Sequence, residues 1–182
     1  DSQQRFEDLG CTVIRAFARF TGPREVQAGD TTIRARRFVI ATGSRPLVPQ
    51  IQGIDSVPYL TNETIFGLRE RPRHLIIIGG GPIGRELAQA HRRLGCAVTV
   101  VEGAQVLGRE DPELAAMVIE ALRAEGTALF EGQPVVRLAG EAGAVEVTLG
   151  DGRQIAGTHL LIAVGRKVAL EGMNLDSAGV AH

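Results

Sequence analysis

Residues 75–102 read LIIIGGGPIGRELAQAHRRLGCAVTVVE, and this stretch decides the fold. It opens with Leu75–Ile78, a short apolar run that is typical of a strand buried on both faces. A glycine-rich turn follows, and apolar residues then recur with the spacing of one helix face: Ile83, Leu87, Ala90 and Leu94. Gly95 is suited to end that helix, and residues 97–102 predict the next buried strand. The stretch therefore predicts a strand–helix–strand unit.

The glycines after the first strand form the pattern Gly79-x-Gly81-x-x-Gly84, which in this setting is typical of a dinucleotide site. We expect Gly79 to allow a sharp turn, Gly81 to let a pyrophosphate approach the backbone, and Gly84 to let the helix pack closely on the strand. The helix N-terminus offers free N–H groups and the positive end of its dipole to the phosphates. The candidate cofactor-binding residues of the turn are Gly79, Gly80, Gly81, Pro82, Ile83 and Gly84.

Glu102 ends the second strand, at about the 20-residue distance that this motif requires of its acidic residue. A carboxylate there can accept hydrogen bonds from both ribose hydroxyls and repels a 2′-phosphate, so it predicts NAD rather than NADP. Arg109 is the residue that favours NADP, but Glu110 and Asp111 adjoin it, and we expect it to be paired locally. The loop between them, residues 103–108, contains no Lys or Arg.

The rest of the pattern predicts a three-layer α/β fold with a parallel sheet and a small antiparallel meander. Asp111 and Pro112 are suited to begin a second helix, and Gly126 to end it. We expect the buried face of that helix to consist of Leu114, Met117, Val118, Ala121 and Leu122. Strands are expected at 127–131 and 159–165, with the meander at 135–136, 145–149 and 154–155.

The N-terminal third predicts short strands at Thr12–Ala18, Thr31–Arg36 and Phe38–Ala41, and prolines then mark a connector. The run FVIATGSR at 38–45 has an echo in LLIAVGR at 160–166. We interpret the two runs as places where the chain passes between two related domains.

Composition excludes several classes of function. The 182 residues carry a net charge of −1, so no basic excess is present to bind nucleic acid. Cys11 and Cys96 are far apart and no histidine cluster accompanies them, so the sequence indicates neither a disulfide framework nor a metal site. No apolar run is long enough to span a membrane and no signal peptide is visible, so we expect a cytoplasmic location. Arg85, Arg92 and Arg93 are expected on the solvated face of the first helix.

Three motifs, in their order and spacing, resemble the pyridine nucleotide-disulfide oxidoreductases. They are VIATGSRP at 39–46, IGGGPIGRE at 78–86 and AVGR at 163–166. The stretches REDP at 109–112 and LRAEG at 122–126 look most like the mercuric reductase and dihydrolipoamide dehydrogenase branches. The resemblance implies a homodimeric flavoenzyme in which NAD(P)H reduces FAD, and FAD reduces a disulfide or a bound substrate.

The resemblance also implies roles for single residues. Glu86, which the helix dipole alone would favour at its position, would lie near the nicotinamide, and Gly165 close to the bound nucleotide. Thr42 and Gly43 would approach FAD. The implied domains are 1–70, a partial FAD-domain segment with its connector, then 71–160, a Rossmann-type NAD(P)-binding domain, and 161–182, a return segment.

The sequence departs from this family in ways that limit its activity. The earlier flavin fingerprint and the Cys-x4-Cys pair are missing, and the first residue is Asp1 rather than Met. We therefore expect an excised middle segment that binds NADH and needs the remainder of the parent flavoenzyme for turnover. Two alternatives stay open: a parent of the NADH oxidase or ferredoxin reductase kind, and a stand-alone nucleotide-binding or redox-sensing module that regulates a partner. The electron acceptor also stays open, with disulfide, lipoamide and mercuric ion as candidates.

Overall fold

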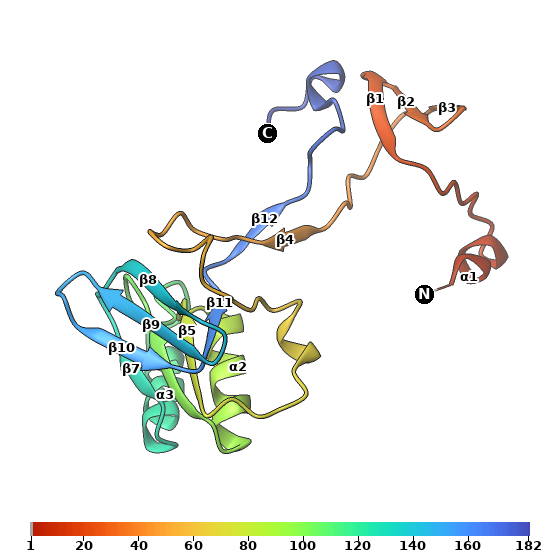
Figure 1. Cartoon of the computed structure of the whole chain (residues 1–182). Coiled ribbons are helices and arrows are strands. Elements are labelled where there is room, and N and C mark those ends of the chain that lie inside the picture. The colour runs from red at the N-terminus through yellow and green to blue at the C-terminus, as the bar shows by residue number, and fades with distance from the viewer. Residues whose placement is uncertain (1) are drawn as a thin grey trace. The chain divides into compact units, whose positions relative to one another are not determined.

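The structure is a computed structural model that describes residues 2–182, and the chain forms two compact units (Figure 1). One unit combines the residues up to Ser44 with Val168–His182. The other is the continuous segment Arg45–Lys167, and it contains the glycine-rich turn. Among residues 2–182, no helix is long and apolar enough to cross a membrane.

The Arg45–Lys167 unit is built on a parallel sheet with the strand order β11-β5-β6-β7. The strands are β5 (His74–Ile78), β6 (Ala97–Val101), β7 (Ala128–Phe130) and β11 (His159–Ile162). Helix α2 (Pro82–Arg93) joins β5 to β6, and α3 (Pro112–Ala124) joins β6 to β7. The predicted strand–helix–strand unit is therefore confirmed.

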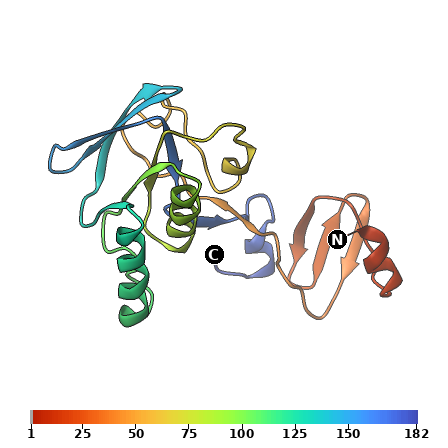
Figure 2. The same cartoon turned by 90° about the horizontal axis from the view of Figure 1, so that it is seen from below.

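An antiparallel sheet with the order β10-β9-β8 lies between β7 and β11 in the sequence. Its strands are β8 (Val135–Glu141), β9 (Ala144–Leu149) and β10 (Gln154–Gly157), which confirms the predicted meander. A short 3-10 helix, η1 (Ile65–Gly67), precedes β5. Figure 2 shows α2 and α3 on one side of the parallel sheet and the meander on the other.

Alternation along β5 explains why the sheet has a layer on each face. Leu75 and Ile77 pack with Leu87 and Ala88 of α2, whereas Ile76 and Ile78 pack with the meander. All four strand residues are buried, and each such side chain contributes about 1.5–3 kcal/mol by leaving water. A continuous apolar run is what a strand covered on both faces requires.

The helix ends follow the local signals in the sequence. The Asp111 carboxylate accepts hydrogen bonds from the backbone N–H groups of Glu113 and Leu114, at 3.0 and 3.2 Å, and so caps α3. Gly95 and Gly126 adopt positive φ angles of 88° and 85° just beyond α2 and α3. A left-handed residue at this position is the usual end of a helix.

The buried faces of both helices differ from the prediction. On α3, Leu114 and Met117 are 63% and 68% exposed, and Ala121 is exposed as well. Val118 and Leu122 face the unit as predicted, and Ala115 and Ile119 complete the packed face in place of Leu114, Met117 and Ala121. On α2, Leu87 is buried and Ile83 packs on the core as predicted, whereas Ala90 and Leu94 are exposed and Gly84 and Ala88 are buried in their place. Two stripes on α3 have helical spacing, and contact of Ala115 with the buried pair Val106 and Leu107 selects the second.

The other unit contains a small antiparallel sheet with the order β1-β2-β3. Its elements are α1 (Gln3–Asp8), β1 (Ala18–Gly22), β2 (Glu25–Ala28), β3 (Thr31–Arg34) and the 3-10 helix η2 (Leu175–Ala178). Phe20 and Val26 from the sheet pack with Met173 and Leu175 from the C-terminal segment. The Phe38 ring meets Phe20 edge-on, with ring centroids 5.2 Å apart.

Here the predicted strands are partly wrong. Of Thr12–Ala18 only Ala18 is in a strand, and Phe38–Ala41 forms none, although Phe38 and Ile40 pack on the core. No described strand pairs with 38–41, and Val39 is 90% exposed, so the apolar run is not buried on both faces. Strand β2 and helix α1 were not predicted from the sequence.

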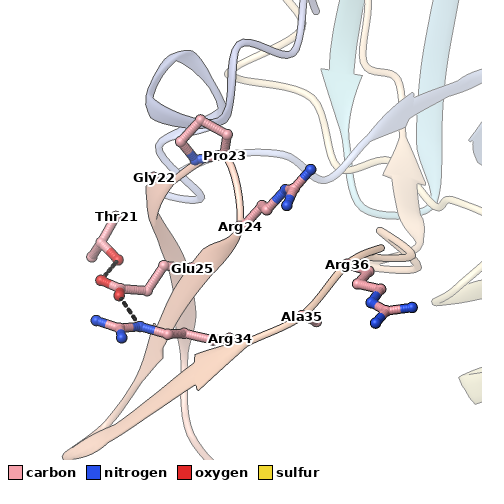
Figure 3. Close-up of a pocket in the computed structure, with 8 residues that line it drawn as sticks. All are labelled: Thr21, Gly22, Pro23, Arg24, Glu25, Arg34, Ala35 and Arg36. Carbon is pink, nitrogen blue, oxygen red and sulfur yellow. Dashed lines mark hydrogen bonds and ion pairs between the residues drawn. The ribbon is translucent and has the colours of Figure 1, made fainter.

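A hollow of about 550 Å³ lies beside β2 and β3 in this unit (Figure 3). Arg34 donates a hydrogen bond to Glu25 at 2.8 Å, and Thr21 donates another at 2.9 Å. The hydrogen bond from Arg34 is the main reason why the pKa of Glu25 lies below its ordinary value. The acid of this hollow is thus already neutralised by its own neighbour.

Strands β4 (Ser44–Pro46) and β12 (Arg166–Val168) pair where the chain passes between the units. The two echoed runs of the sequence end at these strands. The Gly165 carbonyl accepts a hydrogen bond from Leu47 N–H, and the Gly43 carbonyl accepts one from Ala169 N–H, both at 3.0 Å. Each of these hydrogen bonds joins two residues of the same unit, close to the point where the chain passes to the other unit.

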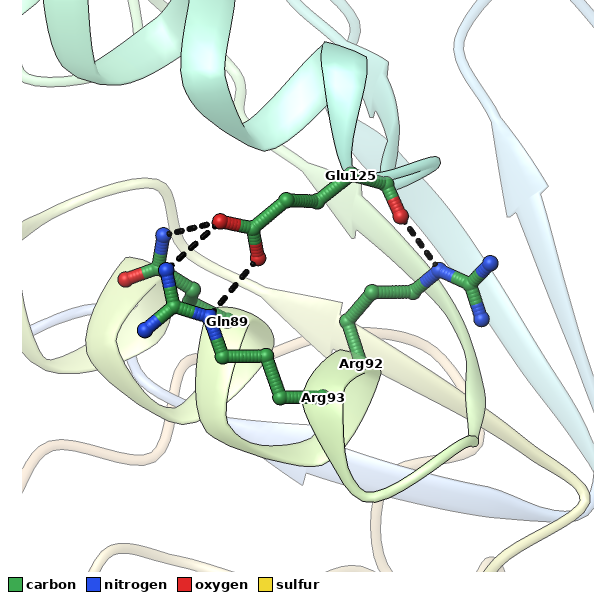
Figure 4. Close-up of polar contacts among 4 residues, drawn as sticks. All are labelled: Gln89, Arg92, Arg93 and Glu125. Atoms are coloured by element: carbon green, nitrogen blue, oxygen red, sulfur yellow. Dashed lines mark hydrogen bonds and ion pairs between the residues drawn. The ribbon is translucent and has the colours of Figure 1, made fainter.

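Polar side chains connect α2 to the end of α3 (Figure 4). The Glu125 carboxylate accepts hydrogen bonds from Arg93 at 2.6 Å and from Gln89 at 2.9 Å, and its backbone carbonyl accepts one from Arg92 at 2.7 Å. The hydrogen bond from Arg93 is the main cause that lowers the pKa of Glu125. Arg93 is exposed as expected, although it is paired with Glu125, whereas Arg92 is half-buried, so the expectation of a solvated position is wrong for Arg92. Arg85 is half-buried, and its Nε atom is fully buried.

Two leucines of α3 provide a matched test of its buried face. Leu122 is 1% exposed and Leu114 is 63% exposed. We expect Leu122→Ala to lower the free energy of unfolding by about 2–5 kcal/mol because it leaves a cavity. Leu114→Ala should change it by less than about 0.5 kcal/mol. Urea denaturation measures both, and equal losses would contradict this packing.

The Glu125 cluster predicts a pH dependence of stability. Because the pKa of Glu125 is lower in the folded chain, the unfolded chain binds more protons at acidic pH. The contribution of this group is therefore complete above its unfolded pKa and is lost as the pH falls through its folded pKa. We expect Glu125→Gln to reduce the loss of stability as the pH falls from the unfolded pKa of this carboxyl group through its lower folded pKa. Urea denaturation at several pH values tests this, and identical pH profiles would contradict it.

Candidate functional site

The glycine-rich turn lies at the carboxyl edge of the parallel sheet. Gly79 follows β5 directly, and its N–H donates to the Val101 carbonyl at the end of β6, at 2.9 Å. On the other side of β5, the Ala163 N–H donates to the Ile78 carbonyl at 2.8 Å. The ends of three parallel strands therefore surround the turn, which is where ligands bind in open α/β sheets.

Three glycines of the turn are required by the protein's own packing. Gly79 has a φ of 112°, and a Cβ there would collide with the Ala163 carbonyl. A Cβ on Gly84 would collide with the Gly79 carbonyl, so only glycine lets α2 begin this close to β5. A Cβ on Gly80 would lie 2.7 Å from a methyl group of Val106.

Gly81 is different from these three glycines. It is the N-cap of α2, with a φ of −72° that any residue can adopt, and a Cβ there would meet no atom within 4 Å. Its lack of a side chain is therefore not explained by the fold itself. The space in front of it is open to a ligand that approaches the backbone.

The first turn of α2 has donors to offer at this position. Gly81 has no side chain to cap the helix, and Pro82 has no N–H. The intrahelical hydrogen bonds begin when Arg85 N–H donates to the Gly81 carbonyl at 3.1 Å. The N–H groups of Ile83 and Gly84 are therefore first-turn donors of the kind that bind anions at a helix start.

Glu102 is held against this turn by backbone hydrogen bonds. Its Oε2 accepts from Gly80 N–H at 2.7 Å, and its Oε1 accepts from Ala104 N–H at 2.9 Å. The side chain is half-buried. A carboxylate has about four acceptor positions, so two remain for other donors after these bonds. This contact with Gly80 is the feature of the site that the sequence did not predict.

The loop after Glu102 closes over Gly80. Leu107 N–H donates to the Gly80 carbonyl at 3.1 Å, and Val106 N–H donates to the Glu131 carboxylate at 3.0 Å. Leu107 is buried and has a positive φ of 55°, a conformation that leucine rarely adopts. Both backbone groups of Gly80 are thus used within the protein, which leaves Gly81 and the start of α2 for a ligand.

The other predicted site residues lie in more open surroundings. Glu86 and Pro82 are exposed on the first turns of α2, and Ile83 is half-buried. Gly165 is exposed, with a φ of 131°. Thr42 and Gly43 belong to the other unit, and Gly43 has a φ of 75°.

Arg109 differs from its prediction. It is exposed and forms no ion pair with any residue in the described range 2–182. The reason is that the neighbouring Asp111 carboxylate caps α3 instead.

Thiols and metal ligands are not gathered at this site. Cys11 is exposed in one unit and Cys96 is buried in the other, and both are free. Burial raises the pKa of the Cys96 thiol. Within residues 2–182, no three His, Cys, Asp or Glu side chains are grouped so that they could hold a metal ion.

Known proteins with similar sequences include mercuric reductases and a dihydrolipoyl dehydrogenase. A mercuric reductase of Streptomyces lividans is 40% identical over 189 residues, which cover 97% of this chain and 40% of that protein. A dihydrolipoyl dehydrogenase of Thermus scotoductus is 36% identical over 176 residues, covering 92% of this chain and 38% of that protein. The chain thus spans about two fifths of the length of these curated relatives.

Solved structures show the same fold. The Cu(II) complex of the HOCl-induced flavoprotein disulfide reductase RclA from Escherichia coli superposes with a TM-score of 0.83 at 32% identity, over 98% of this chain and 42% of that one. A ferredoxin reductase from Rhodopseudomonas palustris gives 0.82 at 25% identity, over 100% of this chain and 48% of that one.

The family match itself covers almost the whole chain. The family described as pyridine nucleotide-disulphide oxidoreductase matches residues 3–182. This is the family that the three sequence motifs resemble, and the parallel sheet with its antiparallel strands agrees with it. The chain therefore belongs to the pyridine nucleotide-disulphide oxidoreductases.

Proposed function

We propose that this chain is the NAD(H)-binding part of an FAD-dependent oxidoreductase, which passes a hydride from NADH to flavin and on to a disulfide or a metal ion. The observation that carries the proposal is the open space at Gly81, beside first-turn N–H groups and the fixed carboxylate of Glu102. The 71–160 nucleotide-binding domain of this proposal lies within the Arg45–Lys167 unit. The relatives named as mercuric reductase and dihydrolipoyl dehydrogenase support the reaction class.

In this proposal, different residues of the chain bind the pyrophosphate and the adenosine ribose of the nucleotide. Ile83 and Gly84 donate their N–H groups to the pyrophosphate, which approaches across Gly81. Glu102 accepts hydrogen bonds from the adenosine ribose hydroxyls with the acceptor positions that Gly80 and Ala104 leave free. Because the carboxylate is held in place before the nucleotide arrives, little side-chain entropy is lost on binding.

The same carboxylate supports NAD over NADP. A 2′-phosphate would place a second negative charge next to Glu102, and like charges in contact disfavour binding. Arg109, the residue that would favour NADP, is exposed on the same loop. Along the chain, the buried residues Val106 and Leu107 separate it from Glu102.

In this proposal the remaining predicted site residues lie near the nicotinamide and the flavin. Glu86 lies at the nicotinamide end of the site, Gly165 lies close to the nucleotide, and Thr42 with Gly43 approach the flavin. Bound NADH supplies the hydride, and the chain binds and orients it. We place the flavin fingerprint and the acceptor site in parts of the protein outside residues 1–182, so this chain alone binds NADH without turnover.

A second candidate is a parent without an intrachain disulfide pair. The ferredoxin reductase from Rhodopseudomonas palustris, which covers the whole chain at a TM-score of 0.82, favours it. A Cys-x4-Cys pair in the full-length protein distinguishes the two, because only the disulfide branch has one.

Gly81 and Gly84 give a matched test of the nucleotide site. Gly81→Ala adds a methyl group where nothing lies within 4 Å, so we expect the free energy of unfolding to change by less than about 1 kcal/mol. The same methyl group stands in the path of the pyrophosphate, so NADH affinity should fall by about tenfold or more.

Gly84→Ala is the control for this pair. Its Cβ collides with the Gly79 carbonyl, so stability itself should fall by about 2 kcal/mol or more. Urea denaturation and nicotinamide fluorescence separate the two effects. Unchanged NADH binding in Gly81→Ala would sink the proposed site.

Glu102 is tested by the preference between NADH and NADPH. The unaltered chain should bind NADH at least about tenfold more tightly, a difference of about 1.4 kcal/mol. Glu102→Ala should weaken the binding of NADH and reduce the difference in affinity between NADH and NADPH. The substitution removes both the acceptor for the ribose hydroxyls and the charge that repels a 2′-phosphate. Parallel titrations that follow nicotinamide fluorescence measure both affinities.

The control is Glu131→Ala, because the Glu131 carboxylate also holds this loop by accepting a hydrogen bond from Val106 N–H, whereas its other hydrogen bond is with Arg123 rather than with the glycine turn. If Glu102→Ala acted only by loosening the loop, both variants would weaken the binding of NADH and of NADPH by the same factor. An unchanged preference in Glu102→Ala would show that Glu102 does not read the ribose.

A further inference from the structure

The amino edge of the parallel sheet, at the opposite ends of the strands from the glycine turn, has two adjoining hollows. One of about 490 Å³ is lined by the segment 68–73, by Gly143 of the β8–β9 turn, and by Thr158 and His159 at the start of β11. The second, of about 570 Å³, shares Arg73, Gly143 and Thr158 with the first. Segments far apart in the sequence therefore converge on one surface.

The first hollow is rich in cations that the protein does not neutralise. Arg69 and Arg73 are exposed, and their guanidinium groups form no ion pair or hydrogen bond with any residue in 2–182. His159 contacts Thr158 through Nδ1 at 3.1 Å, which leaves its Nε2 for another partner. Glu70 is the one acidic residue in this lining. The cluster thus has an excess of positive charge.

Arg71 and His74 lie in the same region and have hydrogen-bond partners within the protein. Arg71 donates to the Gly95 carbonyl at 2.8 Å, beyond the end of α2, and His74 Nε2 contacts the Thr99 hydroxyl at 2.9 Å. Their roles are structural. Arg69 and Arg73 alternate with them in the same segment and have no such partner. The two free arginines therefore need another explanation.

The base of the hollow is held firmly. The Thr158 hydroxyl accepts from His74 N–H at 3.1 Å and donates to the His74 carbonyl at 3.0 Å. Thr158 N–H donates to the same carbonyl at 2.9 Å, and Pro72 between the arginines is buried. Because the backbone on both sides is fixed, the positions from which Arg73 and His159 project are fixed as well.

These observations indicate a preformed site for an anion. Two guanidinium groups beside one hollow repel each other, and a multivalent anion between them removes that repulsion. The planar donor fork of arginine matches the oxygens of a phosphate group in pairs. A volume of about 490 Å³ is larger than a single inorganic ion requires and falls in the range of small-molecule sites.

We propose that the hollow formed by residues 68–73, Gly143, Thr158 and His159 binds the phosphate monoester group of a small metabolite. Arg69 and Arg73 contact the phosphate oxygens, and His159 Nε2 adds a further contact. The open remainder of the hollow accommodates the organic part. This site is separate from the glycine turn and does not depend on the proposed nucleotide binding.

Glucose 6-phosphate is the probe, with glucose and inorganic phosphate as comparisons. Calorimetric titrations are made at pH 8 and at constant ionic strength set with chloride, since surface charges are screened by salt. We expect saturable binding of the ester, weaker binding of inorganic phosphate and none of glucose. Arg73→Gln and Arg69→Gln should each weaken the ester by about tenfold, since charge-assisted hydrogen bonds are lost.

Two controls keep this test specific. Arg15→Gln removes an exposed arginine of the other unit and should leave the affinity unchanged. Gly81→Ala should also leave it unchanged, which separates this site from the phosphate position at α2. Urea denaturation checks that each variant is folded; both arginines are exposed, so a stability loss is not expected.

Three outcomes overturn the proposal. They are no saturable binding of glucose 6-phosphate, binding that Arg73→Gln and Arg69→Gln leave intact, and binding that Gly81→Ala abolishes. Binding of inorganic phosphate as tight as that of the ester overturns the assignment to a monoester.

Discussion

Between β5 and α2 the backbone passes so close to itself that no side chain fits, and the rest of the site depends on this contact. Gly84 lies against the Gly79 carbonyl, and Gly79 lies against the Ala163 carbonyl of the neighbouring strand end. These contacts determine where α2 begins. They thereby aim its first N–H groups along the carboxyl edge of the sheet, and they leave Gly81 as the position in the turn where space stays open. A larger residue at 79 or 84 would displace the helix start and the anion position together.

Glu102 links this turn to the neighbouring strand. It leaves the end of β6 and accepts the N–H of Gly80, so one carboxylate satisfies a buried backbone donor and faces the proposed ribose position. Leu107 and Val106 then close over Gly80 from the following loop, at the cost of a left-handed leucine. A strained residue of this kind costs on the order of 1 kcal/mol and persists only where its surroundings determine it. The loop is therefore part of the structure of the turn rather than a free connection.

Predictions from the sequence were correct where a local pattern is compatible with a single structure. The run at 75–78, the cap at Asp111 and the stops at Gly95 and Gly126 act through their own backbone, and they lie as predicted. Periodicity was wrong for part of α3 because two sets of apolar residues have helical spacing. Leu114 and Met117 repeat as regularly as Ala115 and Ile119, and only tertiary contact with Val106 and Leu107 decides between them. Phe38–Ala41 has the composition of a buried strand, but strand formation requires a neighbour, which composition does not report. The hydrogen bond between Glu102 and Gly80 joins residues that no local pattern connects.

The two edges of the parallel sheet differ in how their charges are balanced. At the carboxyl edge, backbone N–H groups supply the positive potential, and the Glu102 carboxylate accepts hydrogen bonds from the backbone N–H groups of Gly80 and Ala104. At the amino edge, α2 ends, and its carbonyl groups favour cations there. Backbone N–H groups that follow α2 already donate to the carbonyls of Ala90, His91 and Arg92 in its last turn. Arg71 and Arg92 donate to the Gly95 and Cys96 carbonyls just beyond the helix. The helix end therefore does not account for Arg69 and Arg73. Their charge is left over after the fold's own needs are met, and a surplus of this kind favours a ligand from outside the chain.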